Sequence, residues 1–276
     1  MNKFICRVLR FSGVNALYEI FAPSRLLLLG YHSISCRRAE EAGAGAIPHL
    51  SIPMEHFEKE MRYLKNHGYS FLTFSDLLDV ENGSQVLPPR PVIVYFDDGY
   101  RDNYLCAYPA LAALNIRAAV FPVVGFIEGS TKPWESGEAH SAAALSWDEI
   151  CAMGDVFEYG THTMTHRKLP SLSQDEVRWE ISESRRLIEA RTGRKVLALS
   201  YPKSRFTMEV ARVASDEGFA FMLSHGRGPN YRGSEYKFLS KIPVSPDDDM
   251  TSFILKLGAY YPLRSLIRRI LGRNTP

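Results

Sequence analysis

The sequence contains few cysteines, no long hydrophobic run and little excess charge, and each of these absences excludes a class of protein. Its four cysteines are widely spaced and include no CxxC pair, which predicts reduced thiols in a cytosolic protein rather than a disulfide framework; they are Cys6, Cys36, Cys106 and Cys151. The aliphatic run at residues 26–29 is far shorter than the about 20 residues of a membrane-spanning helix. It predicts a buried strand instead.

Net charge and the N-terminal segment argue against two further classes of protein, those that bind polyanions and those that carry a cleaved signal peptide. The formal net charge of the 276 residues is +2, so the composition predicts no general affinity for nucleic acid or other polyanions. Lys3, Arg7, Arg10 and Glu19 interrupt the apolar residues of the N-terminus, which leaves no apolar stretch of the about 7–15 residues that a cleaved signal peptide needs. We therefore expect a cytoplasmic protein.

Strand and helix patterns alternate along the chain. Continuous apolar runs predict buried strands at residues 25–34, 69–74, 91–96, 117–124, 155–163, 196–202, 219–226 and 237–244. Helical spacing predicts helices at residues 54–68, 75–80, 105–114, 147–153, 173–193 and 207–217. Such alternation predicts βα units around a parallel sheet, and seven or eight units would close as an α/β barrel, a fold of about 250 residues.

Polar residues follow several of the predicted strands at the point where each strand ends. Because a parallel barrel carries its active site at the carboxyl ends of its strands, this placement predicts one shared site rather than scattered surface residues. The residues in question are Tyr31, His32, Asp97, Asp98, His162, Tyr201, His225 and Arg227.

Two short motifs carry the chemistry of this predicted site. The strand PVIVYF is followed by Asp97, Asp98 and Gly99, and the segment GTHTMTH holds His162 and His166 four positions apart. Separately, the first could be an ordinary turn and the second a structural histidine pair. Together, two imidazoles and one carboxylate leave coordination positions open on a divalent metal, while a second carboxylate can accept a proton from water. The combination predicts metal-assisted hydrolysis.

On these motifs, the chain resembles the polysaccharide deacetylase family, also known as carbohydrate esterase family four or the NodB-homology domain. The FDDG at residues 96–99 is similar to the first motif of the family, and GTHTMTH is similar to the second. The resemblance extends to the YH at residues 31–32, the helix and strand of residues 57–73 and the late LSKIPV segment, and it covers roughly residues 26–255. It implies a distorted (β/α) barrel with seven or eight parallel strands.

The resemblance also implies how the site divides its work. Asp98, His162 and His166 would bind a divalent metal, most commonly zinc, although cobalt and nickel share such ligands. Asp97 would be the general base, and the substrate would be an acetamido sugar. A protonated group must then assist departure of the sugar amine.

The sequence departs from the family pattern at two places. The third motif, often R-x-P-Y, is matched here by Ser200, Tyr201, Pro202 and Lys203, so the arginine that orients the base is absent from that position. Arg227 and Lys241 are the candidates to replace it, and both also suit a merely solvated cation. The late L-x-x-H acid motif is unclear. His225 is one candidate acid and His32 is the rival; either histidine could instead be structural.

Contacts with a sugar are assigned to residues near the expected cleft. The predicted set comprises His32, Trp134, Tyr201, Pro202 and Lys203, in which Trp134 and Tyr201 would pack against the CH faces of a pyranose. Core packing is the alternative for the aromatic residues, and it is the interpretation we favour for Trp147 at the start of a helix.

The two ends of the chain flank the predicted barrel domain of residues 25–255. Residues 256–276 form a basic amphipathic tail, and residues 1–24 repeat the pattern more weakly. Basic amphipathic helices bind anionic membrane surfaces, so this pattern predicts peripheral contact with the inner membrane of a bacterium. The alternative is that both ends pack on the barrel or are disordered tails.

The sequence therefore predicts a metal-dependent hydrolase that removes N-acetyl groups from an amino sugar in a bacterial surface polysaccharide or its lipid-linked precursor, such as one of lipopolysaccharide or capsule assembly. A deformylase or other amidase acting on a lipid-linked amino sugar is the nearest alternative. A catalytically silent barrel that binds glycan is the alternative from another class, and it is motivated by the missing third-motif arginine.

Overall fold

The apolar run that precedes Asp97 becomes a fully buried strand of a barrel. In the computed structural model, which describes residues 25–44, 47, 49–131, 143–225, 230–231, 237–258 and 260–261, strand β5 spans Pro91–Asp98 and is buried along its whole length. It pairs in parallel with β1 (Arg25–Tyr31) on one side and with β6 (Ala118–Pro122) on the other. A strand buried on both faces explains why this run does not alternate with polar residues.

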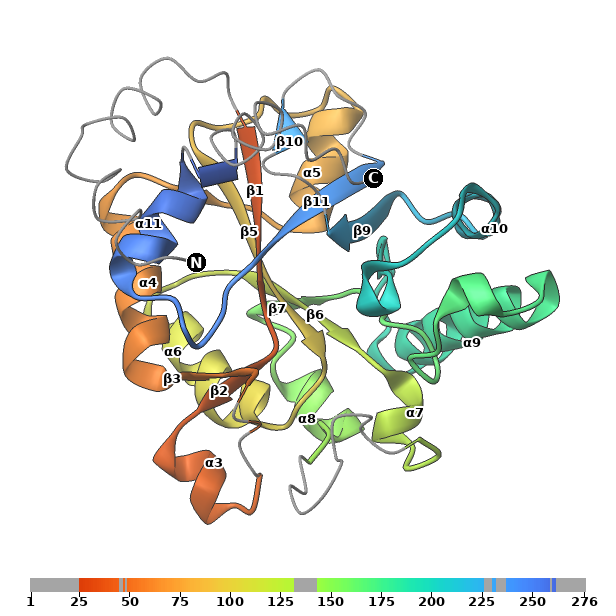
Figure 1. The fold of residues 1–276 in the computed structure, drawn as a ribbon, viewed down its shortest axis with the longest axis horizontal. Helices are drawn as coiled ribbons and strands as arrows, with labels where there is room; N and C mark the ends of the chain where they lie inside the picture. The colour runs from red at the N-terminus through yellow and green to blue at the C-terminus, as the bar shows by residue number, and fades with distance from the viewer. Residues whose placement is uncertain are drawn as a thin grey trace, which may run out of the picture.

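Seven parallel strands form a nearly closed barrel (Figure 1). Their order is β7-β6-β5-β1-β11-β9-β8, where β7 is Phe157–Tyr159, β8 is Ala198–Ser200, β9 is Phe221–His225 and β11 is Phe238–Pro243. A parallel bridge between Thr161, just after β7, and Leu199 of β8 joins the two ends of the sheet. The predicted α/β barrel of seven or eight parallel strands is confirmed, with seven strands.

Short strands and helices surround the barrel. The short strands are β2 (Ser33–Ser35), β3 (Ser51–Pro53), β4 (Ser70–Phe71) and β10 (Asn230–Tyr231). The helices are α3 (Arg37–Glu41), α4 (Met54–Asn66), α5 (Phe74–Glu81), α6 (Tyr108–Ala113), α7 (Val124–Ile127), α8 (Trp147–Ala152), α9 (Gln174–Thr192), α10 (Met208–Asp216) and α11 (Met250–Leu257). Figure 1 shows α4 and α6 on one side of the barrel and α9 and α10 on the other.

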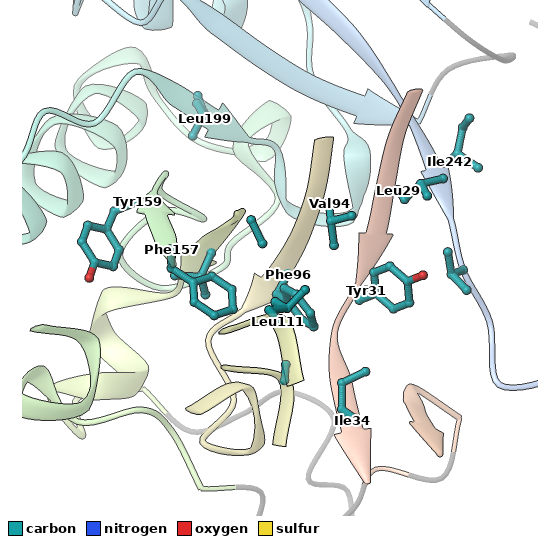
Figure 2. Packing of buried hydrophobic residues seen from close by; sticks show 14 of the residues in the cluster. Leu29, Tyr31, Ile34, Val94, Phe96, Leu111, Phe157, Tyr159, Leu199 and Ile242 are labelled. Carbon is teal, nitrogen blue, oxygen red and sulfur yellow. The ribbon is translucent and has the colours of Figure 1, made fainter. Parts of the chain in front are cut away.

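Along six of the seven barrel strands, alternate apolar residues belong to two different clusters, whereas the apolar residues of β7 all belong to the larger one. The smaller cluster includes Leu28, Ile93 and Leu239 and fills the barrel, while the larger one lies between the strands and the helices (Figure 2). Because side chains alternate along a strand, Asp97 continues the inner face of Ile93, and Lys241 continues that of Leu239. The barrel thus directs both polar side chains to the top of its own interior.

Capping residues in the sequence predicted where helices begin, and the structure differs from these predictions at two helices. Helix α9 begins at the predicted capping box of Ser173 and Glu176. Helix α5 starts earlier than predicted, because Thr73 and not Ser75 caps it. The helix predicted at residues 105–114 is preceded by a π-helical turn at Asn103–Ala107, and Pro109 lies in the first turn of α6, where proline fits without disturbing the helix.

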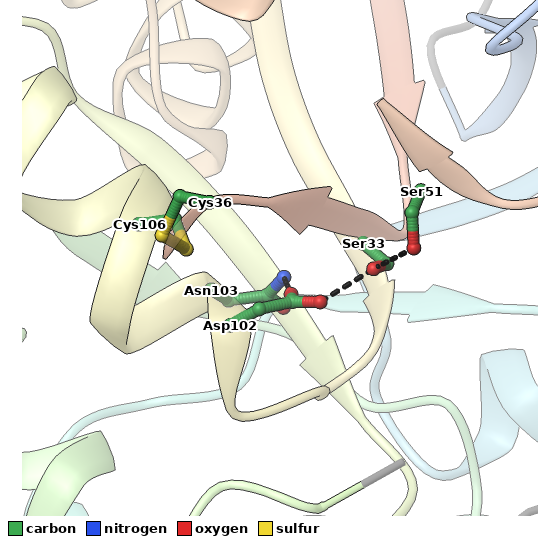
Figure 3. Close-up of a disulfide and its surroundings, with 6 residues drawn as sticks. All are labelled: Ser33, Cys36, Ser51, Asp102, Asn103 and Cys106. Carbon is green, nitrogen blue, oxygen red and sulfur yellow. Dashed lines mark hydrogen bonds between the residues drawn. A yellow bond between two sulfur atoms is a disulfide. The ribbon is translucent and has the colours of Figure 1, made fainter. Parts of the chain in front are cut away.

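Two of the four cysteines form a disulfide, so the prediction of reduced thiols is wrong for this pair. Cys36 follows β2 and Cys106 lies in the π-helical turn, and their sulfurs are 2.02 Å apart (Figure 3). Their sequence separation of 70 hid the pairing, because widely spaced cysteines carry no local signal. Cys151 is a free, exposed thiol.

The disulfide should contribute measurably to stability. Closing a loop of 70 residues removes entropy from the unfolded chain, which corresponds to about 4 kcal/mol in the chain-entropy model. We expect the double variant Cys36→Ser/Cys106→Ser to lose about 2–4 kcal/mol in urea denaturation. Cys151→Ser is the matched control and should unfold like the wild type. Equal midpoints for all three proteins would show that the disulfide adds no stability.

A buried carboxyl group on the inner face of α4 predicts a second effect on stability. Burial raises the pKa of Glu60 to about 8. A hydrogen bond from the Tyr31 hydroxyl, at 2.8 Å, lowers this pKa but does not offset the effect of burial. The folded protein therefore binds more protons than the unfolded chain between about pH 4.5 and 8, so stability should fall as the pH rises through this window. We expect Glu60→Gln to flatten this dependence by roughly 1–3 kcal/mol, whereas Glu58→Gln on the exposed face of the same helix should retain it.

The ends of the chain and two site candidates lie outside the described residues. These are residues 1–24 and 262–276, Trp134 and Arg227, and the side chain of His225 is likewise outside. Among the described residues, no helix combines the length and the apolar character that crossing a membrane requires.

Candidate metal centre

The first half of the site is the tight turn that ends β5. Asp98 has a φ of 77°, and Gly99 follows with the same value. A Cβ on Gly99 would stand 2.8 Å from the Pro122 Cβ, so glycine is required both by the backbone conformation and by the close approach of β6. The turn directs Asp97 and Asp98 to different parts of one cleft.

The second half is the turn of residues 162–166, which follows β7. The His162 amide donates to the Pro122 carbonyl oxygen at 3.0 Å, which ties this turn to β6. Thr163 and His166 have φ values of 72° and 57°. A β-branched residue rarely adopts such a conformation, so the surrounding structure must enforce it. Asp98, Thr163 and His166 thus place three non-glycine residues in the left-handed conformation at this site.

Three side chains converge on one point. His162 Nε2 and His166 Nε2 are 3.1 Å apart, and Asp98 Oδ1 lies 3.5 Å from the first and 4.0 Å from the second. Ligands about 2.1 Å from a tetrahedral ion stand about 3.4 Å from one another, so these spacings fit a zinc-sized ion. All three residues are buried, and they form the one group of three or more potential ligands found among the described residues.

The protonation of both histidines also suits metal binding. His162 Nδ1 lies 2.6 Å from the carbonyl oxygen of Ser200, which can only accept, so this nitrogen carries the proton and Nε2 faces the ion site. Burial lowers the pKa of His162 to about 4 and that of His166 to about 2. Neutral imidazoles at physiological pH are the form that a metal requires.

Asp97 is not part of the group formed by Asp98, His162 and His166, and its carboxylate is bound by Lys241 and Ser200 instead. Lys241 Nζ donates to Asp97 Oδ2 at 2.9 Å, and the Ser200 hydroxyl donates to Asp97 Oδ1 at 2.7 Å. Lys241 also donates to the Ser200 hydroxyl at 2.5 Å, which completes a triangle. Burial alone would raise the pKa of Asp97, but the Lys241 ammonium outweighs it and holds that pKa well below its usual range. Asp97 is therefore an ionised carboxylate inside the barrel.

A cleft of about 240 Å³ opens above these groups. Its wall includes both aspartates, both histidines and Lys241, together with Gly30, His32, Leu50, Tyr95, Tyr201, Lys203, Ser204 and Pro243. The volume is small compared with the pockets of drug-sized ligands, and the cleft is open to solvent on one side. It suits a single polar ring or an acyl group rather than a large apolar ligand.

The structure brings together most of the site residues expected from the sequence. His32 and Lys203 line the cleft with the four main residues, and Pro202 is buried at the start of the short turn that presents Lys203. Tyr201 contributes to the wall, but its ring is fully buried, stacks on Phe206 at 4.8 Å and places its hydroxyl 3.0 Å from Met222 Sδ.

Two further site residues received no final assignment from the sequence. Ser200 contacts Asp97 through its hydroxyl and His162 through its carbonyl oxygen, and it occupies the position where the family pattern has arginine. Lys241 was one of two candidates for the missing cation, and the other, Arg227, lies outside the described residues. The signal that could have singled out Lys241 is its place two positions after Leu239 in an apolar strand, because residues at that spacing share one face of the strand.

Comparison with known proteins decides the family. The family model described as polysaccharide deacetylase matches residues 84–222, which is half of the chain and includes both motifs. The chain belongs to the polysaccharide deacetylase family. Members of this family are hydrolases that act on carbon–nitrogen bonds, and carbohydrate esterase family four deacetylases depend on a metal.

Two sequence relatives of this deacetylase illustrate the range of the family. YxkH of Bacillus subtilis, whose own assignment as a polysaccharide deacetylase is provisional, is 27% identical over 238 residues, which cover 86% of this chain and 76% of YxkH. A poly-β-1,6-N-acetyl-D-glucosamine N-deacetylase of Staphylococcus aureus is 26% identical over 166 residues, or 59% of this chain. The match spans about half of that enzyme, 53% of its length.

Solved structures share the fold of this deacetylase. The Streptococcus pyogenes deacetylase PplD, crystallised with acetate, superposes with a TM-score of 0.72 at 21% identity, covering 86% of this chain and 99% of PplD. A de-N-acetylase of Aggregatibacter actinomycetemcomitans gives a TM-score of 0.71 at 21% identity, covering 83% of this chain and 98% of that one. At these identities the likeness establishes the barrel and nothing finer.

Proposed function

We propose that this deacetylase removes N-acetyl groups from an amino sugar of a bacterial surface polysaccharide or of its precursor. One observation carries the proposal: the ligand group of Asp98, His162 and His166 shares a cleft with Asp97, an ionised carboxylate held by Lys241. A metal-ligand triad alone fits many functions. A triad with a separate, oriented base fits hydrolysis.

The roles of the residues follow from their contacts. Asp98, His162 and His166 would hold a divalent metal, zinc in the first instance with cobalt or nickel as substitutes, and the metal would supply Lewis-acid activation of water and of the acyl carbonyl. Asp97 accepts a proton from the attacking water. The Ser200 hydroxyl and Lys241 hold both of its oxygens, so its carboxylate is oriented before substrate binds.

The sugar amine needs a proton as it leaves, and His225 and His32 are the two proposed donors. His32 lines the cleft, and Asn103 Nδ2 donates to its carbonyl oxygen at 2.8 Å, which fixes the backbone at this point. His225 ends β9, and its backbone pairs with that of Lys241 in β11, the neighbouring strand of the sheet. Substrate contacts are proposed for His32 and Lys203 at the wall, together with Pro202 and with Trp134, which lies outside the described residues. The predicted contact of Tyr201 would be made without its ring face, because that ring is fully buried against Phe206.

Lys241 takes over the work of the arginine that the third motif lacks. Its removal would leave Asp97 buried without its cation, which is costly for a carboxylate. We expect Lys241→Met to lower kcat about 10- to 100-fold while bound metal and KM change little, and Lys241→Arg to retain much of the rate. Lys237→Met, just before the same strand, is the control. A Lys241→Met enzyme with wild-type kcat would remove Lys241 from the proposal.

The substrate class is inferred from the named relatives and from the cleft. The poly-β-1,6-N-acetyl-D-glucosamine N-deacetylases make an N-acetylglucosamine polymer the first candidate, and a lipid-linked amino sugar of lipopolysaccharide or capsule assembly is the second. The predicted membrane contact through the chain ends would favour the second. The Cys36–Cys106 disulfide favours an oxidising compartment over the expected cytoplasm, and thiol labelling of the protein in intact cells would distinguish the two.

Product analysis tests the proposed reaction. The purified enzyme, loaded with zinc or cobalt, is incubated with N-acetylated and N-formylated glucosamine oligomers and with lipid-linked amino sugars. We expect acetate to accumulate in equal amounts with new free amines. Formate in place of acetate would instead make the protein a deformylase. Neither product from any of these substrates, with the metal bound, would contradict the proposal.

A further inference from the structure

The conformation of the turn at residues 162–166 depends on contacts with neighbouring segments. Residues 162–166 include Thr163 and His166 in left-handed conformations, which are disfavoured for non-glycine residues. Such a turn keeps its two imidazoles together only if neighbouring groups bind its backbone firmly. The groups that do so come in large part from helix α9, which begins at Gln174, shortly after the motif, and packs behind it.

Glu180 of α9 makes three contacts with this turn. Its carboxylate accepts from the Thr165 amide at 2.8 Å through Oε2 and from the Thr165 hydroxyl through Oε1. Its backbone carbonyl accepts from the Met164 amide at 3.2 Å. One helical turn further on, the hydroxyl of Ser184 is 2.8 Å from that of Thr161. These contacts hold the chain at Thr161, just before His162, and at Thr165, just before His166.

The burial of Glu180 indicates a specific role for this residue. Burying a carboxylate costs folding free energy, so stability alone does not explain it. Its side chain is 0% exposed, and it forms no ion pair with a lysine or arginine of the described residues. Apolar residues of similar size usually stabilise such a position at least as well. Both oxygens are instead used on Thr165, the residue immediately before His166.

We propose that Glu180 is a positioning residue that fixes His166 for metal binding by bracing the turn of residues 162–166 from behind. The inference rests on the proposed function of these histidines as ligands. Glu180 lies one step further from the ion than the groups that hydrogen-bond a ligand directly. A displacement of about 1 Å at a ligand nitrogen is enough to impair a site, so the brace should control metal affinity.

Three variants distinguish bracing from a general structural role. Glu180→Met keeps the length of the side chain and removes both acceptors. Glu180→Gln keeps both contacts, because its carbonyl oxygen accepts from the Thr165 amide while its NH₂ group donates to the Thr165 hydroxyl. Glu183→Met makes the same chemical change on the solvent side of α9, where Glu183 pairs with Arg186 at 2.7 Å.

The measurements are the dissociation constant for Co²⁺ and the visible spectrum of the cobalt-loaded protein, which reports coordination geometry without any substrate. We expect Glu180→Met to weaken Co²⁺ binding about 10- to 100-fold and to alter the spectrum. Glu180→Gln should stay within about threefold of the wild type with an unchanged spectrum, and Glu183→Met should match the wild type. If Glu180→Met does not fold, Thr165→Val replaces it, and we expect it to weaken binding about three- to tenfold.

Two results would overturn the brace. One is a folded Glu180→Met, or a Thr165→Val used in its place, with wild-type affinity and spectrum. The other is a Glu180→Gln as defective as Glu180→Met, which would mean that the negative charge and not the position matters. A wild type that binds Co²⁺ but releases no acetate from any substrate contradicts the proposed function alone. A wild type that deacetylates while Glu180→Met binds metal equally well contradicts the brace alone.

Discussion

Replacing Asp97 with asparagine should abolish most turnover and leave the metal in place. Asparagine keeps the size of the side chain but cannot accept a proton from water, and general bases contribute about 10²–10⁴-fold to rate. Asp97 lies beside the ligand group without joining it, because its two oxygens are bound by Ser200 and Lys241. We therefore expect kcat to fall within that range at wild-type metal content.

The measurement pairs steady-state kinetics with metal analysis of the same sample. Asp76→Asn is a suitable control, because Asp76 is part of the capping box of α5 and lies outside the cleft. An Asp97→Asn variant with undiminished kcat would remove Asp97 as the base. A loss of metal together with rate would show instead that Asp97 is needed to form the ion site. If the wild type itself is inactive but binds sugar, the barrel is a glycan-binding protein.

Replacing His162 with alanine should remove the metal itself. His162 contributes Nε2 to the ligand group, and its other ring nitrogen is bound to the Ser200 carbonyl oxygen, so the ring has no alternative orientation that preserves both contacts. Loss of an outer partner of a ligand costs about 10- to 100-fold in metal affinity, and loss of the ligand should exceed that. Turnover should fall in parallel with occupancy.

Metal content by elemental analysis and the Co²⁺ dissociation constant both report this loss. His67→Ala is the matched control, because His67 is exposed at the end of α4 and stacks on Tyr63 instead of facing the cleft. A His162→Ala protein that retains full metal content would refute the assignment of the ligands. A protein that loses metal but keeps its rate would separate the metal from the reaction.

The barrel and the ligand group could be predicted because their signals are local. Each buried strand is a continuous apolar run, and Asp97, Asp98, His162 and His166 directly follow two of these runs. Parallel strands end at one rim, so strand order is not needed to bring these residues together. Family resemblance then divided the roles between the two aspartates.

The remaining features depend on contacts between distant segments. The Cys36–Cys106 disulfide spans 70 positions, and the Lys241–Asp97 pair spans 144. Register decides the second, because a shift of one residue in β11 would turn Lys241 away from the barrel interior. Glu180 was invisible for a different reason. It sits in a charged helix whose sequence does not reveal that this one carboxylate faces the metal-binding turn.

Acetate release as a function of bound metal tests the central claim most directly. The chain is stripped of metal with a chelator, and acetate released from an N-acetylglucosamine oligomer is measured while zinc or cobalt is added back in fractions of one equivalent. We expect no release from the stripped protein and a rate that rises in proportion to occupancy up to one ion per chain. Release that is unchanged after stripping, or absent at full occupancy, would contradict the central claim.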